Sequence, residues 1–202
     1  MKLVKVPAIA DMLYPSMVWR MPADEKVIYL TFDDGPNPEV TPKVLRILEE
    51  YGAKATFFCL GENVVVHHYM FNMILKAGHK VGNHGYQHLN GWKTNTRSYA
   101  DNFDLASPFI RTDLIRPPYG KIRHSQIRHL REHYRIVGWS VMAYDFDRSV
   151  SPRQCYSNIV NNATSGSIIV LHENDKSAHT MLAVLPQVLR HFTGKGFVFK
   201  SL

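Results

Sequence analysis

Two adjacent acids, Asp33 and Asp34, follow an apolar run in the segment VIYLTFDDGP, residues 27–36. The apolar residues can fill a buried strand, so the two carboxylates are expected at its tip. Asp-Gly and Gly-Pro are also strong turn formers, and an ordinary turn is the alternative interpretation. Paired carboxylates could divide two tasks, because one acid can bind a cation while its neighbour accepts a proton.

His84 and His88 in NHGYQH are the natural candidates for metal ligands. Their spacing places both imidazoles on one side of a helical turn or folded loop, but His129 and His133 repeat it on an expected helix surface. The position of His84 and His88 after a strand end favours them. Two imidazoles and one carboxylate leave an open coordination position, as in a catalytic divalent site, where a bound water can be activated.

Short apolar runs alternate with helical patterns along the chain. The expected strands are 27–32, 55–60, 80–83, 114–116, 135–139, 167–171 and 197–200, and the expected helices are 41–51, 64–77, 97–109, 125–132, 152–161 and 180–191. Continuous apolar strands separated by helices indicate a parallel sheet that is buried on both faces. About seven such units in 202 residues favour an α/β fold with a closed or nearly closed barrel.

The chemistry of parallel β/α folds gathers at the carboxyl ends of the strands. Besides the acid pair and the histidine pair, the expected strand ends place Arg116 before PPYG and His172 after IIVL, and the segment VMAYDFD follows Trp139. The carboxyl ends of parallel strands share one face of a barrel, so these side chains are expected to converge.

Composition narrows the classes of partner. The 24 Lys and Arg are interspersed with acids, so the net charge of +7 does not indicate a nucleic-acid-binding protein. No segment reaches the roughly 18 to 20 apolar residues of a membrane span, so no membrane partner is expected. Pro7, Asp11 and Pro15 interrupt any signal-peptide core, and a cytoplasmic location is expected if Met1 is the natural start.

Five segments carry a family resemblance: TFDDGP, NHGYQH, RPPYG, WSVMAYDF and IIVLHEN. In order and approximate spacing they are similar to the five motifs of polysaccharide deacetylases, the NodB-homology domain of carbohydrate esterase family 4. The resemblance implies a distorted (β/α) barrel of the glycoside hydrolase/deacetylase type. It also implies one domain over residues 1–202, with residues 1–26 as an N-terminal extension that packs on the barrel.

The same resemblance implies a metal-dependent hydrolase that acts on carbon–nitrogen bonds other than peptide bonds in acetylated carbohydrates. By motif position, Asp33 resembles the catalytic base and Asp34 the metal-binding acid, with His84 and His88 as the other ligands. Arg116 is similar to the arginine that orients the base. Zinc is the expected metal, and cobalt and manganese are the alternatives.

His172 resembles the general acid of the family, and Asp145 resembles the acid that tunes it, although Asp147 stands two residues further along. The resemblance implies that the backbone N–H of Tyr119 helps to hold the oxyanion. Val170 occupies a position where an aliphatic side chain lines the pocket for the acetyl methyl group.

Aromatic side chains after strand ends, Trp92 and Phe146 among them, could stack on a sugar ring, although aromatic residues more often belong to a core. Three positions depart from the family pattern, and one of them is Val170, which replaces a larger leucine of the methyl pocket. Gly85 replaces a serine or threonine that could hold the loop by local hydrogen bonding. Phe146 replaces a tryptophan, which keeps an aromatic wall but removes an N–H donor.

The sequence therefore predicts a carbohydrate N-deacetylase that releases acetate by means of a metal-bound water. Two alternatives stay open. One is a carbohydrate O-acetyl esterase, because the same water attacks esters more easily than amides. The other is a catalytically impaired module that binds metal and glycan, which the departures at Gly85 and Phe146 motivate. The sequence specifies neither the glycan nor the oligomeric state.

Overall fold

The computed structural model describes residues 2–202, and Met1 lies outside the described residues. The strands are β1 (Met17–Val18), β2 (Val27–Asp33), β3 (Ala55–Cys59), β4 (Lys80–Asn83), β5 (Leu114–Ile115), β6 (Arg135–Val137), β7 (Val141–Met142), β8 (Ile168–His172) and β9 (Val198–Phe199). The helices are α1 (Ile9–Leu13), α2 (Thr41–Glu50), α3 (Gly61–Val66), α4 (His68–Lys76), α5 (Thr96–Ala106), α6 (His124–Leu130), α7 (Pro152–Val160) and α8 (Asp175–Thr193), with a 3₁₀ turn, η1, at Pro118–Gly120.

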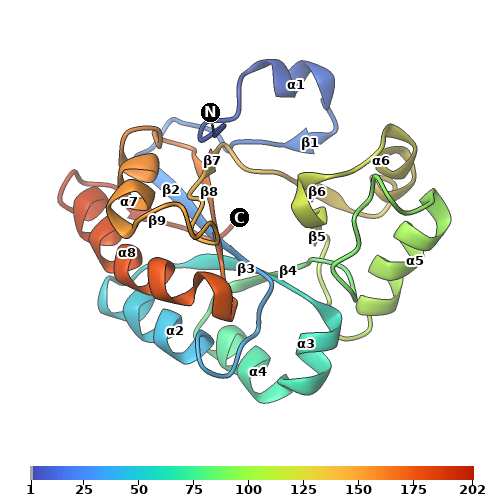
Figure 1. Ribbon diagram of the computed structural model, residues 1–202, viewed down its shortest axis with the longest axis horizontal. Helices are drawn as coiled ribbons and strands as arrows, with labels where there is room; N and C mark the ends of the chain where they lie inside the picture. The colour runs from blue at the N-terminus through green and yellow to red at the C-terminus, as the bar shows by residue number, and fades with distance from the viewer. Residues whose placement is uncertain (1) are drawn as a thin grey trace.

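The strands of the described chain form one sheet in the order β1-β6-β5-β4-β3-β2-β8-β7, and β9 pairs with β2. Every pair of neighbouring strands is parallel. The sheet curls into an incomplete barrel with the helices around its outside (Figure 1). The predicted α/β fold with a distorted barrel is confirmed.

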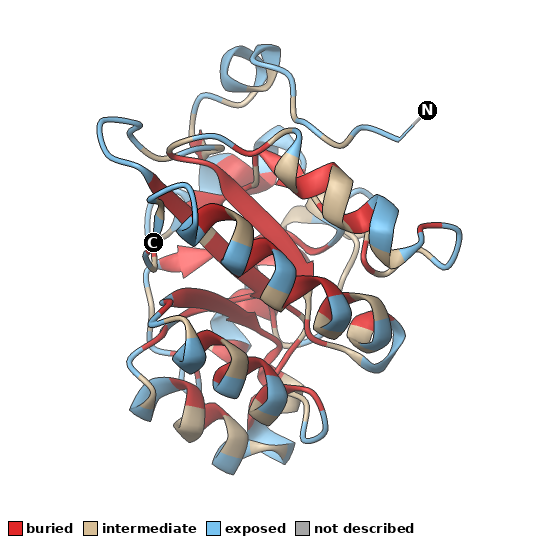
Figure 2. Cartoon of the chain, turned by 90° about the vertical axis from the view of Figure 1, so that its left-hand side faces the viewer, coloured by how far each residue is buried: buried red, intermediate tan, exposed pale blue. Residues whose placement is uncertain are grey.

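The apolar strand sequences explain this arrangement. Six of the seven residues of β2 and all five of β3 are buried, so both faces of these central strands are covered. Phe32 and Phe57 stack with ring centroids 5.0 Å apart inside the main core. Figure 2 shows the strands and the inward faces of the helices buried, and the outward helix faces exposed.

The N-terminal segment contacts both ends of the sheet. Val4 accepts a hydrogen bond from the backbone of Met142, and Val6 donates one to Ser140 at 3.0 Å. Strand β1 then pairs with β6 and forms the opposite end of the sheet. These contacts lie within the stretch expected as an extension, and the assignment of residues 1–202 to one domain stays a prediction.

Several element boundaries differ from those expected. The helix expected over 64–77 is two helices, because His67 leaves the helical region with φ −115° and ψ 42°. The strand expected over 135–139 ends at Val137, and a separate short strand, β7, follows it. The helix expected over 180–191 begins at Asp175, and Asn174 caps it.

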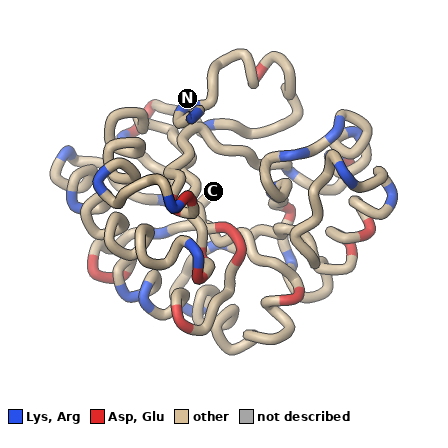
Figure 3. The backbone as a smooth tube through the Cα atoms, in the orientation of Figure 1, with Lys and Arg blue, Asp and Glu red and all other residues tan. Residues whose placement is uncertain are grey.

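Charged residues are spread around the periphery. Lys and Arg are interspersed with Asp and Glu on the helices and loops that surround the barrel (Figure 3). Within residues 2–202, no helix combines the length and the apolar character that a membrane crossing requires.

Candidate active site and metal site

A pocket of about 370 Å³ lies at the carboxyl ends of β2, β4 and β8. Eight of the residues singled out in the sequence line it: Asp33, Asp34, His84, His88, Tyr119, Phe146, Val170 and His172. A larger cavity of about 570 Å³ lies between α2 and α4, beside the amino ends of β3 and β4, and contains none of them. The predicted chemistry therefore converges on the smaller pocket.

Asp34, His84 and His88 form a compact cluster of potential ligands. The Oδ1 atom of Asp34 lies 3.6 Å from Nε2 of His84 and 3.4 Å from Nε2 of His88. All three ligand atoms lie within 4.8 Å of one another. Ligands at about 2.0–2.1 Å from a tetrahedral zinc ion are roughly 3.3 Å apart, so the spacing suits such an ion.

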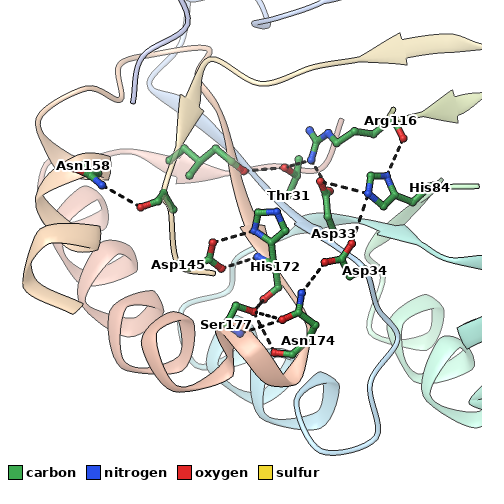
Figure 4. A network of polar contacts seen from close by, with 12 residues as sticks. Thr31, Asp33, Asp34, His84, Arg116, Asp145, Asn158, His172, Asn174 and Ser177 are labelled. Atoms are coloured by element: carbon green, nitrogen blue, oxygen red, sulfur yellow. Dashed lines mark hydrogen bonds and ion pairs between the residues drawn. The ribbon is translucent and has the colours of Figure 1, made fainter. Parts of the chain in front are cut away.

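The backbone fixes which nitrogen of His84 faces the cluster. Nδ1 of His84 lies 2.8 Å from the carbonyl oxygen of Arg116. A carbonyl oxygen only accepts hydrogen bonds, so Nδ1 carries the proton and the lone pair of Nε2 faces Asp34 (Figure 4). Burial lowers the pKa of His84 to about 3, which keeps the imidazole neutral, as a metal ligand must be.

The Asp34 carboxylate offers a free oxygen to the two imidazoles. Its Oδ1 atom is buried and has no hydrogen-bond partner. A buried carboxylate oxygen without a partner is costly unless a cation or a proton completes it. Burial also lowers the pKa of His88. The donor set therefore fits a divalent cation with N and O ligands.

Asp33 occupies a different environment from that of its neighbour. Its side chain is buried, and Oδ1 accepts a hydrogen bond of 2.7 Å from Nη1 of Arg116. Its other oxygen, Oδ2, lies 4.0 Å from Nε2 of His84, at the edge of the ligand cluster. Asp33 is thus paired with an arginine, whereas Asp34 faces the imidazole of His84 (Figure 4).

Arg116 is fully buried, and backbone and side-chain groups surround its guanidinium. It donates to the hydroxyl of Thr31 at 2.6 Å and to the carbonyl oxygen of Gly138 at 2.8 Å. The guanidinium also lies 4.1 Å from the ring centroid of Phe58. Burial lowers the pKa of Arg116 and the charge of Asp33 opposes this, so the paired ions offset each other's desolvation.

Asp145 and His172 form a second acid–imidazole pair. Oδ1 of Asp145 lies 2.9 Å from Nδ1 of His172. Burial alone would lower the pKa of His172, but the attraction and hydrogen bond of Asp145 prevail and raise it to about 9. Asp147, the alternative acid, instead pairs with Lys2 at 2.7 Å on the surface.

The pocket walls combine aromatic and aliphatic side chains. Phe146 meets His172 edge-on with centroids 4.7 Å apart, and Tyr119 meets His88 in the same way at 4.3 Å. Val170 is completely buried where it lines the pocket. Trp92 is 55% exposed and is not among the lining residues, although Lys121 on the pocket wall lies 5.4 Å from the centre of its ring.

Gly85 is required by the conformation of its loop. Its φ of +86° is in the left-handed region, and a Cβ atom there would clash with the side chain of Asn102. Its N–H donates to Oδ1 of Asn83 at 2.7 Å, and its carbonyl oxygen accepts from Gly61 at 2.9 Å. The backbone of Gly85 thus holds the loop without the hydroxyl that the family pattern would supply.

Several residues that sequence reasoning missed also contribute to the site. Lys121, Trp139 and Lys176 line the pocket, and Asn174 contacts Asp34. Asn174 precedes Asp175, Lys176 and Ser177, a pattern typical of a helix N-cap, and this pattern could have indicated an earlier start for α8.

The geometry defines a β/α-barrel protein with a cluster suited to a divalent cation. Beside it lie an acid–arginine pair, Asp33 and Arg116, and an acid–imidazole pair, Asp145 and His172. A family model described as polysaccharide deacetylase matches residues 20–135. A peptidoglycan-N-acetylglucosamine deacetylase of Bacillus cereus is 32% identical, with 92% of this chain and 91% of the relative covered. The chain belongs to the polysaccharide deacetylase family, as the five motifs predicted.

A solved structure and a second relative agree with this assignment. The crystal structure of the Bc1960 peptidoglycan N-acetylglucosamine deacetylase has a TM-score of 0.87 and 31% identity, and the match covers 98% of this chain and 95% of that one. A bifunctional xylanase/deacetylase of Pseudobutyrivibrio xylanivorans is 31% identical, with 89% of this chain and 30% of the relative covered. Together these similarities support a hydrolase that acts on acetylated carbohydrates.

Proposed function

We propose that this protein is a metal-dependent carbohydrate deacetylase that hydrolyses the N-acetyl group of an acetamido sugar in a glycan and releases acetate. The observation that carries the proposal is the division of labour between two adjacent acids. Asp34 faces two neutral imidazoles, whereas Asp33 is paired with Arg116. Two adjacent residues therefore serve as a cation ligand and as a proton acceptor.

Asp34, His84 and His88 would hold the cation, which we propose to be zinc, with cobalt or manganese as substitutes. When bound, a divalent cation supplies Lewis acidity that favours deprotonation of water and polarises a carbonyl oxygen. Asp33 accepts the proton of the attacking water, and Arg116, which binds Oδ1, holds the carboxylate so that Oδ2 faces the ligand cluster. Fixed orientation of this kind is a large part of general-base catalysis.

His172 donates the proton that the leaving amine needs. The hydroxyl of water forms a new bond to the acetyl carbon, the carbon–nitrogen bond breaks, and the nitrogen takes a proton from His172. Asp145 keeps this imidazole protonated by its charge. The backbone N–H of Tyr119 contributes a donor to the developing oxyanion.

The pocket walls support a sugar with an acetyl group. Val170 presents an aliphatic surface for the methyl group, and Phe146 and Tyr119 present rings beside the two reactive histidines. We propose that Trp92, whose ring lies 5.4 Å from Nζ of Lys121 on the pocket wall, stacks on a more distant sugar ring. The names of the similar proteins direct the choice of substrate to glycans that contain N-acetylglucosamine.

The test is acetate release from N-acetylglucosamine oligomers and, in parallel, from O-acetylated xylan. Zinc-loaded wild-type protein is expected to release acetate from the oligomers. His172→Ala and Asp33→Asn are expected to reduce the rate by about 10²- to 10⁴-fold, because each removes one proton-transfer group. Asp101→Asn, an exposed substitution on α5, is the matched control and should leave the rate unchanged.

Two results would contradict the proposal. Release from acetylated xylan alone would indicate an O-acetyl esterase. Binding of the oligomers without acetate release in the presence of zinc, cobalt or manganese would indicate a module that binds glycan without turning it over.

A further inference from the structure

Asn174, the last residue of the segment IIVLHEN, was assigned no role from the sequence and lies between the cation-ligand cluster and helix α8. Its Nδ2 atom is 2.6 Å from Oδ2 of Asp34. Its Oδ1 atom accepts a hydrogen bond of 3.0 Å from the backbone N–H of Ser177, in the first turn of α8. Figure 4 shows the amide between Asp34 on one side and Ser177 on the other.

The helix determines which end of the Asn174 amide faces the cluster. A backbone N–H only donates, so the atom that meets Ser177 must be the amide oxygen. The nitrogen then faces Asp34, whose carboxylate only accepts when ionised. Both contacts are satisfied by one orientation of the amide, and the reversed orientation would lose both.

This contact leaves one oxygen of Asp34 for a cation. Oδ2 is occupied by Asn174, while Oδ1 has no hydrogen-bond partner and lies 3.4 Å from Nε2 of His88. Asp34 itself has a φ of 77°, so the loop holds its backbone in the left-handed region. The amide of Asn174 fixes the remaining freedom, which is the rotation of the carboxylate.

We propose that Asn174 is a positioning residue that aims Oδ1 of Asp34 at the cation and ties the cation site to the start of α8. This inference rests on the proposed metal-dependent function. Residues that orient metal ligands typically change metal affinity by about 10- to 100-fold when they are replaced.

The two roles of Asn174 can be separated by substitution. Serine caps helices about as well as asparagine, but its hydroxyl is one atom shorter than the amide and does not reach Asp34 while it caps α8. Alanine removes both the cap and the donor. Asn95 offers a matched control, because its Oδ1 atom accepts from the N–H of Ser98 at the start of α5, away from the site.

The experiment measures the zinc dissociation constant by competition with a chromophoric chelator, and the Tm of the metal-free protein by circular dichroism. N174S and N174A are both expected to weaken zinc binding by about 10- to 100-fold, and the Tm is expected to fall clearly only in N174A. N95S should keep the zinc affinity of the wild type.

Unchanged zinc affinity in N174S, beside a wild-type protein that binds zinc, would overturn the inference. So would weak binding confined to N174A, because loss of affinity would then follow loss of the helix cap. If wild-type protein binds no zinc, cobalt or manganese, the proposed metal site itself fails, and this inference fails with it.

Discussion

Both carboxylate oxygens of Asp145 contact His172: Oδ1 lies 2.9 Å from the ring nitrogen Nδ1, and Oδ2 accepts the backbone N–H at 2.7 Å. The backbone contact fixes the carboxylate, so its other oxygen keeps a constant position against the imidazole. The pair therefore holds a proton on His172 over the neutral range, where a general acid needs one.

Asp145→Asn is expected to lower the pKa of His172 from about 9 toward its ordinary value of 6.5, because burial is then opposed only by the charges of Asp33 and Asp34. In the wild-type protein the pair contributes stability that is complete below pH 6.5 and is lost as the pH rises through 9. Titration of the imidazole of the metal-free protein by NMR measures the change.

Asp147→Asn is the control for this prediction. Asp147 pairs with Lys2 and Ser149 at the surface, so its loss should leave the titration of His172 unchanged. The alkaline limit of acetate release should move to lower pH in Asp145→Asn alone. A His172 pKa that stays near 9 in Asp145→Asn would contradict the account.

Arg116→Met is expected to destabilise the protein by about 3–5 kcal/mol, because it leaves the buried carboxylate of Asp33 without its partner. The carbonyl oxygen of Gly138 loses a donor at the same time. Denaturant unfolding at neutral pH measures the loss, with the exposed Arg111→Met as control. A loss below 1 kcal/mol would mean that Asp33 does not depend on the arginine.

Glu173 predicts a distinct dependence of stability on pH. Burial raises its pKa to about 8, and the charge of Asp34 acts in the same direction. The contribution of Glu173 to the free energy of unfolding is therefore complete below its ordinary pKa of 4.5. It is lost as the pH rises through 8, by a few kcal/mol in total.

Glu173→Gln cannot ionise, so its free energy of unfolding is expected to exceed that of the wild type above pH 8. Denaturant unfolding between pH 5 and 9 measures the difference, and the exposed Glu39→Gln should follow the wild-type curve. Parallel curves for Glu173→Gln and wild type would show that the carboxyl is not protonated in the native state.

Gly85→Ser restores the residue type of the family pattern, yet we expect it to lower stability by about 1–3 kcal/mol. The left-handed backbone and the clash with Asn102 both oppose a side chain here. Thermal unfolding measures the effect, with Gly52→Ser, also at positive φ but in open space, as a comparison that isolates the backbone cost. Equal losses in the two variants would mean that Asn102 moves aside freely.

The sequence predicted the meeting of Asp34 with His84 because both follow strands of one parallel sheet. The length and composition of the apolar runs located β2 and β4. Parallel strands place their carboxyl ends on one face of the sheet. The same reasoning placed Arg116 and His172. This reasoning required only the order of strands and helices along the chain. The hydrophobic pattern and the length of each segment largely determine that order.

Contacts that depend on side-chain direction were not predictable in this way. In the sequence, Thr31 is an ordinary residue of an expected strand. Only the packed structure shows that its hydroxyl faces Arg116. Asn174 was missed because the expected start of α8 lay several residues too late. The pairing of Val4 and Val6 with the edge at β7 joins distant segments, for which local pattern carries no signal.

The most direct test of the account is zinc titration of chelator-treated protein with acetate release from N-acetylglucosamine oligomers as the readout. The account predicts no release without metal and full release at one zinc per chain. It predicts no recovery in His84→Ala and full recovery in His129→Ala, which removes an exposed histidine of the same spacing. Undiminished release by protein shown to be metal-free, or by His84→Ala, would contradict it.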